Sequence, residues 1–199
     1  QQGQVTYRGH PQKTLHAHEA ARFGIARTFQ NIALFKGMSV LDNIMTGRNL
    51  KMHTNFLQQA FYWGATQREE IRHRQKVEEI IDFLQIENIR KTPVGRLPYG
   101  LQKRVELGRA LAAEPKILLL DEPAAGMNPQ ESDELMHFVG KIRDEFDLSI
   151  LMIEHHMQVI MGICDRIYVL NYGGQIADGT PEEIQNNPAV IEAYLGVEE

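Results

Sequence analysis

Cysteine, long apolar runs and an excess of basic charge are all missing or scarce in this 199-residue sequence. The single cysteine, Cys164, excludes an internal disulfide and is typical of a reducing compartment. No apolar run approaches the roughly 20 residues that span a bilayer, and no signal-peptide pattern opens the chain, so we expect a cytosolic protein. Its 21 basic and 26 acidic residues give a net charge of −5, which argues against nucleic-acid binding.

The composition that remains is typical of a globular domain. Hydrophobic residues make up 43% of the chain and charged residues 24%, and the length suits one domain with a small subdomain. The alternation of apolar runs and amphipathic segments from residue 117 to 171 predicts a parallel sheet with helical crossovers, that is, an α/β fold. Residues 31–104 have a helical pattern and are interpreted as an inserted subdomain.

An acidic pair follows the most apolar stretch of the chain. Residues 117–120 are all aliphatic, which predicts a buried strand, and Asp121 and Glu122 come directly after it. Carboxylates at the carboxyl end of such a strand lie where open α/β sheets bind their ligands. The alternative is a core strand that ends in two solvated acids.

Local signals predict most of the remaining elements. Ser39 and Asn128 are expected to cap helices, and Thr66 with Glu69 is expected to form a capping box. The charged stretch 67–76 is interpreted as the solvated face of a long helix. Other expected elements are a helix over 101–113, strands over 149–153 and 166–171, a hairpin through 172–174, two tail helices broken at Pro188, and a buried stripe at Ile71, Val77, Ile80, Ile81 and Leu84.

Four aromatic residues gather in a segment without clear periodicity, Phe56, Phe61, Tyr62 and Trp63. They either cover the core of the subdomain or form a docking surface, and the core is the favoured interpretation.

The acidic pair has the chemistry that phosphoryl transfer needs. One carboxylate can bind a divalent cation while its neighbour orients or activates water. His155 follows the next apolar strand and is expected near the pair if the two strands are adjacent. A neutral imidazole there can hydrogen-bond a terminal phosphate or the attacking water.

Five motifs in order resemble those of ABC transporter ATPases over nearly the whole chain. ILLLDEP is similar to Walker B, AAGMN to the D-loop, IEHHM to the switch-histidine region, TFQN to the Q-loop, and LPYGLQKRVELGRAL to the signature motif with its helix. Within that family, EPAAGMNP and the ending DGTPEEIQNNPAVIEAYLG look most like the ATPase of branched-chain amino acid importers. The resemblance implies a P-loop NTPase fold, with ATP and Mg²⁺ as ligands.

The resemblance also implies a role for each matching residue. Asp121 would hold Mg²⁺, Glu122 would polarise the hydrolytic water, His155 would be the switch histidine, and Gln30 would contact the metal and the γ-phosphate. Nucleotide contacts, some of them to ATP held by a second protomer, would come from Gly100, Tyr99, Gln102 and Asn128. The implied partners are that second ATPase protomer, transmembrane permease subunits and, indirectly, a solute-binding protein, at the cytoplasmic face of the membrane and without nucleic acid.

The resemblance implies four parts of the chain: 1–30, a remnant of the N-terminal core up to the Q-loop; 31–104, the helical subdomain; 105–180, the catalytic core; and 181–199, a helical tail.

Three departures separate this sequence from the family pattern. The phosphate-binding motif G-x-x-x-x-G-K-[ST] is absent, since Gly140-Lys141 lies within an expected helix. We therefore expect an N-terminally truncated chain that binds ATP weakly or not at all by itself. Pro98 replaces the usual serine of the signature, and asparagine and histidine replace the usual aspartates at 128 and 156.

Three alternatives stay open at this point. In the first, the chain is a non-catalytic, degenerate ABC module that dimerises or docks, and Pro98 and the missing lysine favour this alternative. In the second, the chain is an ABC ATPase of DNA repair or translation, and the acidic charge balance argues against this alternative. In the third, the chain is an ABC ATPase that serves the transport of another substrate, such as an exported lipid, urea or other amino acids.

Overall fold

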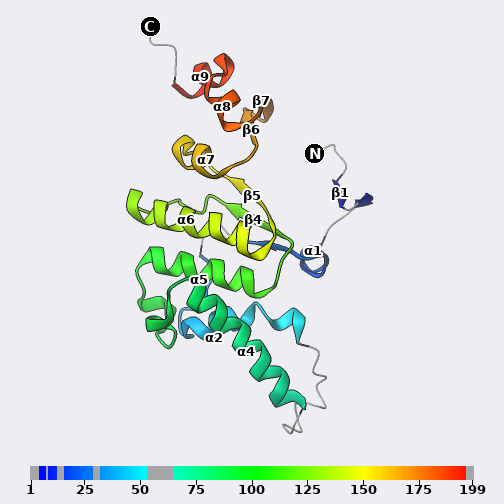
Figure 1. Cartoon of the computed structure of the whole chain (residues 1–199), viewed down its shortest axis with the longest axis vertical. Coiled ribbons are helices and arrows are strands. Elements are labelled where there is room, and N and C mark those ends of the chain that lie inside the picture. The colour runs from blue at the N-terminus through cyan, green and yellow to red at the C-terminus, as the bar shows by residue number, and fades with distance from the viewer. Residues whose placement is uncertain (1–4, 8, 13–15, 29–31, 53–64, 196–199) are drawn as a thin grey trace.

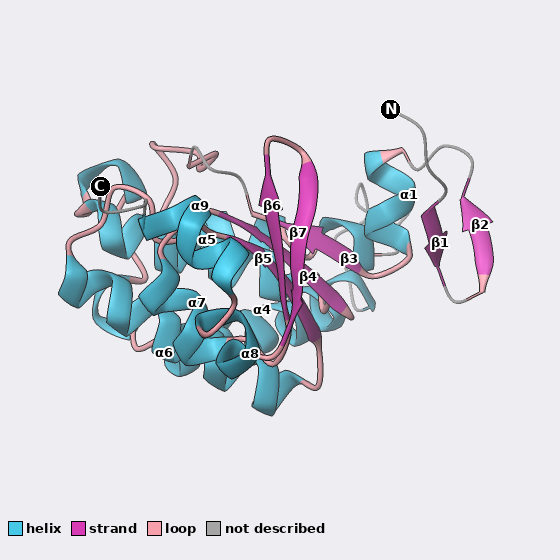
Figure 2. Cartoon of the chain, turned by 90° about the horizontal axis from the view of Figure 1, so that it is seen from above, coloured by secondary structure: helices cyan, strands magenta, loops and turns pink. Residues whose placement is uncertain are grey.

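The computed structural model of the 199-residue chain describes all residues except 1–4, 8, 13–15, 29–31, 53–64 and 196–199. Figure 1 shows three tiers along the long axis: helices α2, α4 and α5 at one end, strands β4 and β5 in the middle, and β6, β7, α8 and α9 at the other end. In Figure 2, α1 and the β1–β2 hairpin lie on the opposite side of the strands from α6 and α7.

A three-stranded parallel sheet forms the centre of the molecule. Its strands are β3 (Ile25–Arg27), β4 (Ile117–Asp121) and β5 (Ser149–Ile153), in the order β3-β4-β5. β4 and β5 pair from Ile117 opposite Ser149 to Asp121 opposite Ile153. The predicted parallel pairing of the two apolar strands is therefore confirmed, and their carboxyl ends lie side by side.

The prediction that the 166–171 strand continues this parallel sheet is wrong. β6 (Ile167–Asn171) pairs antiparallel with β7 (Gly174–Gly179), and among the described strands neither of them pairs with β5. Between β5 and β6 lies a cavity of about 600 Å³. We call this cavity, with the two strand edges beside it, the β5–β6 slot.

The helical tier has its core where α2 (Val40–Thr46), α4 (Ala65–Phe83) and α5 (Tyr99–Ala112) pack together. Ser39 caps α2 as predicted, since its side chain accepts a hydrogen bond from the Asp42 amide. One continuous cluster of buried side chains runs from Val40 in this tier to Leu148 beside the sheet. The boundaries at 31, 104 and 180 stay a prediction.

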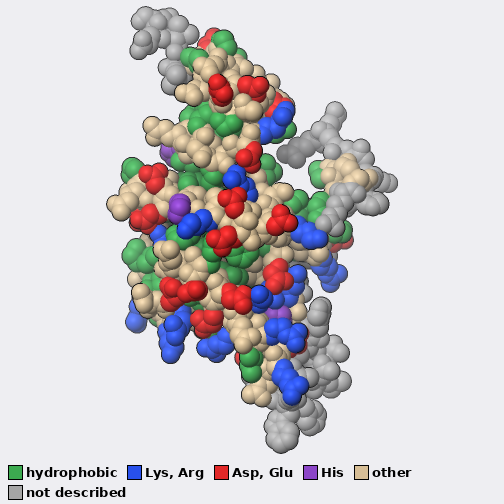
Figure 3. Space-filling view, viewed as in Figure 1, with side chains coloured by type: hydrophobic (Ala, Val, Ile, Leu, Met, Phe, Trp, Pro, Cys, Tyr) green, Lys and Arg blue, Asp and Glu red, His purple; other side chains and the backbone are tan. Residues whose placement is uncertain are grey.

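Three expectations for the long helix are wrong. The described part of α4 begins at Ala65, so Thr66 lies within the helix and not at the predicted N-cap position. Ile71 is 50% exposed, although Val77, Ile80, Ile81 and Leu84 are buried as predicted. His73 is buried within the stretch expected to face solvent, because its ring accepts a hydrogen bond from buried Arg48. Charged side chains of both signs otherwise crowd the face over α4 and α5 (Figure 3).

α6 (Pro129–Phe146) buries the side chains of Leu135, Phe138, Val139 and Ile142 in the core, where the Phe138 ring lies edge-on to Phe83 of α4. Asn128 caps it as predicted: its side chain accepts from the Glu131 amide, and the Glu131 carboxylate accepts from the Asn128 amide. The remaining elements are β1 (Val5–Tyr7), β2 (His10–Gln12), α1 (Ala17–Arg22), α7 (Met157–Ile163), α8 (Pro181–Gln185), α9 (Pro188–Leu195) and short 3₁₀ turns at Asn49–Lys51, Glu87–Ile89 and Val94–Arg96.

None of the helices that the structure describes is both long and apolar enough to cross a membrane. The four aromatic residues at 56–63, for which a core or a docking role was considered, lie outside the described residues.

Candidate active site

The acidic pair lies where β4 ends, as the sequence predicts. Asp121 is the last residue of the strand, and its side chain is 24% exposed. The Arg27 guanidinium, at the end of neighbouring β3, lies 2.6 Å from the Asp121 carboxylate. A charge-assisted bond of this length orients the carboxylate and partly neutralises it.

Glu122 leaves the strand in an uncommon conformation. Its φ of 44° lies in the left-handed region, which costs a non-glycine residue about 1 kcal/mol or more. Its amide donates to the Ile153 carbonyl at 2.9 Å, which fastens the end of β4 to the end of β5. The carboxylate is 28% exposed, so it is accessible to water or a ligand while its backbone is fixed.

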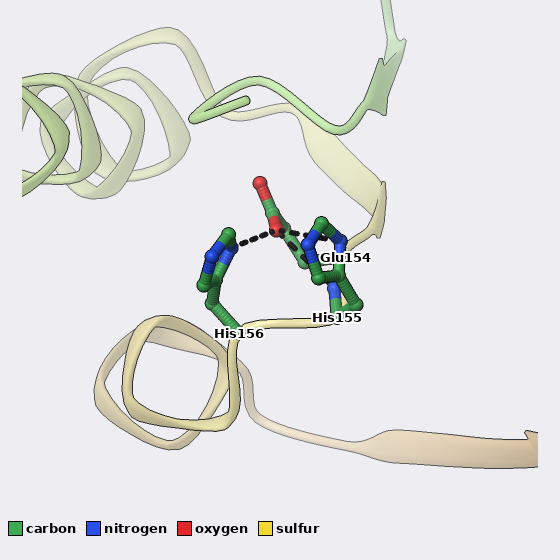
Figure 4. Close-up of side chains that lie close together, drawn as sticks. All are labelled: Glu154, His155 and His156. Carbon is green, nitrogen blue, oxygen red and sulfur yellow. Dashed lines mark hydrogen bonds and ion pairs between the residues drawn. The ribbon is translucent and has the colours of Figure 1, made fainter. Parts of the chain in front are cut away.

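The end of β5 contributes three consecutive polar residues (Figure 4). Glu154 has a side chain with no exposed area, and its carboxylate accepts from the amides of Ala124 and His155 at 3.1 and 3.2 Å. The His156 Nδ1 lies 3.2 Å from the same carboxylate. Both imidazoles are more than half exposed, with ring centroids 4.2 Å apart.

The two strand ends meet through His155 and Glu122. The Nδ1 atom of His155 lies 3.7 Å from the Glu122 carboxylate, as the adjacency of β4 and β5 requires. The site therefore combines a carboxylate next to a cation, a second carboxylate open to solvent, and an imidazole beside it. These are the groups that metal binding, water activation and phosphate recognition require.

A second cluster lies where α5 begins, and it contains the expected site residues Tyr99, Gly100 and Gln102. Gly100 is buried in the first turn of that helix, and a Cβ there would meet the Glu131 carboxylate at 3.0 Å. The Tyr99 ring would lie 3.5 Å from a Cβ at Gly126, in the loop before α6. Because Glu131 also completes the cap at Asn128, the start of α5 and the start of α6 are held together.

The side chains of this second cluster are partly engaged within the chain. Gln102 donates to the Leu97 carbonyl at 2.8 Å. Burial raises the pKa of the Tyr99 phenol, and the charge of Glu106 adds to the shift. Gln30 lies outside the described residues, so its contact with the metal and the γ-phosphate stays a prediction.

Sequence reasoning missed Arg27, Glu154 and Glu131 as members of these clusters. Arg27 ends a short strand, and its contact with Asp121 depends on a pairing 94 residues apart. Glu154 stands in the motif IEHHM, but no role was predicted for it beside the histidines. The available signal was a carboxylate directly after the predicted strand 149–153, as Asp121 and Glu122 follow the strand 117–120.

Comparisons with known proteins agree with this geometry. The profile of the ABC transporter family matches residues 1–125, and a profile described as branched-chain amino acid ATP-binding cassette transporter matches residues 175–199. The high-affinity branched-chain amino acid transport ATP-binding protein BraF of Pseudomonas aeruginosa is 40% identical over 194 residues, which are 98% of this chain and 76% of that protein. The corresponding protein LivG of Salmonella typhimurium is 38% identical, with the same coverage.

Solved structures agree as well. A crystal structure of the ADP conformation of an ATP-binding cassette of an ABC transporter matches with a TM-score of 0.80 at 29% identity, covering 98% of this chain and 77% of that one. The fold class is therefore that of an ABC-type ATPase domain, with the P-loop NTPase fold that the motifs predict. The chain belongs to the ABC transporter family, as an ATP-binding protein related to those of branched-chain amino acid transport.

Proposed function

We propose that this protein is the ATP-hydrolysing subunit that powers an importer of branched-chain amino acids. The observation that carries the proposal is the meeting of Asp121, Glu122 and His155 at the ends of β4 and β5, with 3.7 Å between the Glu122 carboxylate and the His155 ring. The names of the most similar relatives, and the match at residues 175–199, support the substrate class.

Mg²⁺ fits the residues of this site. Magnesium prefers oxygen ligands and is usually bound through one or two carboxylates together with substrate phosphates and water. Asp121 offers such a carboxylate at a partly exposed strand end. When bound, the ion would neutralise charge on the phosphates of ATP. Arg27 balances the charge of Asp121 in the chain as it stands.

Glu122 and His155 take the roles that act on water and phosphate. Glu122 accepts the proton of the attacking water, because its carboxylate is accessible and its backbone is fixed by Ile153. The exposed imidazole of His155 hydrogen-bonds the terminal phosphate or that water. Gln30, in the motif TFQN, is assigned to the metal and the γ-phosphate by resemblance alone.

The phosphate-binding loop is the part of an ATP site that these 199 residues do not supply. We assign its place to the β5–β6 slot, where a parallel strand that ends in a G-x-x-x-x-G-K-[ST] loop would pair with the two edges. Four large side chains beside the slot are about 60% exposed, Leu151, Ile153, Tyr168 and Leu170, and packing of this segment and its helix would cover them. The loop would then lie next to His155, at the carboxyl end of β5.

The cluster at the start of α5 is assigned to the ATP held by a second protomer. Gly100, Tyr99 and Gln102 lie in the first turn of that helix, and the backbone amides of a helix N-terminus favour the binding of an anion. Asn128 begins α6 beside them. Permease subunits and, through them, a solute-binding protein complete the proposed assembly at the cytoplasmic face of the membrane.

The experiment uses the protein from the complete reading frame, reconstituted with its permease subunits and binding protein in vesicles. We expect ATP-dependent uptake of leucine, isoleucine and valine in preference to urea or polar amino acids. The substitution Glu122→Gln should lower ATP turnover by about 100-fold or more and leave nucleotide binding intact. Glu145→Gln, at an exposed position of α6, is the matched control and should change neither. Unchanged turnover in Glu122→Gln would refute the assigned role.

One observation favours a second candidate, a non-catalytic ABC module that dimerises. Pro98 occupies the N-cap position of α5 and makes no side-chain cap, so it offers neither a hydroxyl nor an N–H to a phosphate. On this reading the protein forms nucleotide-dependent dimers without turnover. Comparison with the substitution Pro98→Ser separates the two candidates. A catalytic protein turns over ATP already with Pro98 in place, whereas the non-catalytic module does not.

A further inference from the structure

The three residues after β5 place metal-ligating atoms close together. Glu154, His155 and His156 each offer one ligand atom, and these atoms all lie within 4.8 Å of one another. In Figure 4 the Glu154 carboxylate lies between the two imidazoles, and dashed lines join it to both residues. No other group of three such residues meets this spacing in the part of the chain that the structure describes.

Glu154 is a fixed anchor for this cluster. Its side chain has no exposed area, and the amides of Ala124 and His155 hold its two oxygens. Oxygen Oε2 lies 3.2 Å from the Nδ1 atom of His156 and 4.0 Å from that of His155. A carboxylate held in this way needs no reorganisation to coordinate a cation that the two imidazoles also bind.

The spacing is close to that of a four-coordinate metal site. Ligand atoms about 2.1 Å from a tetrahedral zinc ion lie about 3.4 Å apart. His155 therefore has to approach Oε2, now 4.0 Å away, by less than an ångström. The ligand atoms of the cluster lie within 4.8 Å of one another, so even the widest spacing has to close by no more than about 1.4 Å. Both rings are more than half exposed and can make this adjustment. The Glu122 carboxylate, 3.7 Å from the Nδ1 atom of His155, is placed to supply a fourth ligand.

We propose that Glu154, His155 and His156 bind a divalent transition-metal ion, with zinc as the best fit. Two imidazoles and one or two carboxylates match the ligands that zinc takes in proteins, whereas Mg²⁺ prefers an octahedral shell of oxygens. The site therefore distinguishes the proposed ion from the Mg²⁺ that accompanies ATP. The imidazoles bind as neutral ligands, and one or two carboxylates offset half or all of the charge of a dication.

An ion at this position inhibits ATP turnover. It engages His155, and through the fourth position Glu122, so that neither can contact phosphate or water. This consequence rests on the proposed function, whereas binding of the ion does not. The site thus makes the protein sensitive to an excess of free zinc.

Binding is tested by calorimetric titration of ZnCl₂ into the untagged protein, with Mg²⁺ in excess. We expect one zinc ion per chain and binding at least about tenfold weaker in His156→Asn. Because the chain has eight histidines, His137→Asn on α6 serves as the matched control and should bind as the unchanged protein does. The absence of saturable binding, or equal affinity in His156→Asn, overturns the proposal.

Inhibition is tested in the ATP-hydrolysing protein from the complete reading frame. Zinc at about three times the dissociation constant of the unchanged protein should lower turnover several-fold in that protein, and much less in His156→Asn, because a tenfold weaker site is then only about one quarter occupied. Zinc that binds at the site without lowering turnover overturns the inhibitory role. If no turnover occurs without zinc, the proposed function fails while the metal site, measured by calorimetry, stands.

Discussion

The buried side chain of Asn43 allows a sharp test of how the segment before α2 is held. Asn43 has no exposed area, and its amide oxygen accepts from the Phe35 amide at 2.9 Å. Its amide nitrogen lies 3.1, 3.3 and 3.0 Å from the carbonyl oxygens of Phe35, Met38 and Ser39. One side chain therefore satisfies backbone groups across five residues, and Asn43→Ala removes all of these bonds together.

The expected loss of stability is about 3 kcal/mol. A hydrogen bond contributes about 1 kcal/mol net, and a buried donor or acceptor left without a partner costs about 1–3 kcal/mol. We count about 1 kcal/mol each for the bonds to the N–H and C=O of Phe35, and about 1 kcal/mol more for the donor that is left unpaired. The bonds to Met38 and Ser39 share the remaining N–H, and we add nothing for them.

Urea unfolding followed by circular dichroism measures this loss. Asn186→Ala is the control, because Asn186 is exposed and makes one side-chain bond, to the Glu182 carbonyl, so its loss should stay below about 1 kcal/mol. Asn43→Asp keeps the size of the side chain but places a carboxylate against three carbonyl oxygens, and should be no more stable than Asn43→Ala. A loss below 1 kcal/mol in Asn43→Ala would refute the reasoning.

Two further predictions concern the helical tier. A Cβ at Gly108 would meet side-chain carbons of Leu84, just after α4, and of Ile44 on α2 at 2.9 and 3.0 Å, whereas one at Gly140 meets nothing within 4 Å. In urea titrations Gly140→Ala should therefore stabilise this chain by up to about 1 kcal/mol and Gly108→Ala should destabilise it. Burial, followed by the charge of Arg48, lowers the pKa of His73 below 6.5, against the opposing effect of Glu69. The unfolded state therefore binds the proton of His73 more tightly than the folded state does. The free energy of unfolding then falls as pH drops below 6.5, by at most about 1.4 kcal/mol per pH unit. His73→Gln should flatten this dependence in urea titrations at several pH values, and an equal slope in the variant would contradict the assignment.

Local signals predicted the elements whose causes are local. The caps at Ser39 and Asn128 depend on a side chain and an amide three residues away, and the sequence displays both partners. The strand before Asp121 depends on an unbroken aliphatic run. These elements, and the acidic pair attached to one of them, needed no tertiary information.

The burial of His73 in α4 could not be predicted, because its cause is distant in sequence. His73 stands among charged residues that face solvent, yet it is buried through a bond to Arg48, 25 residues earlier. Arg48 in turn donates to the Ala112 carbonyl on α5. Helical periodicity describes one helix at a time and contains no information about a polar network between three helices.

The hairpin that joins β6 to β7 through 172–174 is confirmed, but the parallel pairing of β6 with the central sheet was mispredicted for a related reason. An apolar run following a helix is typical of a parallel strand, and residues 167–171 have this pattern. Pairing, however, requires a neighbouring edge, and the turn at Tyr172 and Gly173 brings β7 to one edge of β6. The slot at the other edge separates β6 from β5.

The geometry of the site follows from sheet register more than from either loop. The Glu122 amide binds the Ile153 carbonyl, and the Glu154 carboxylate accepts from the Ala124 amide, so two bonds cross between the ends of β4 and β5. A slip of one residue between the strands would break both bonds and turn alternate side chains to the other face. The distance between Glu122 and His155 is therefore fixed by the whole pairing of the two strands. Substitutions that keep this register should preserve the site, even where they change the exposed side chains beside it.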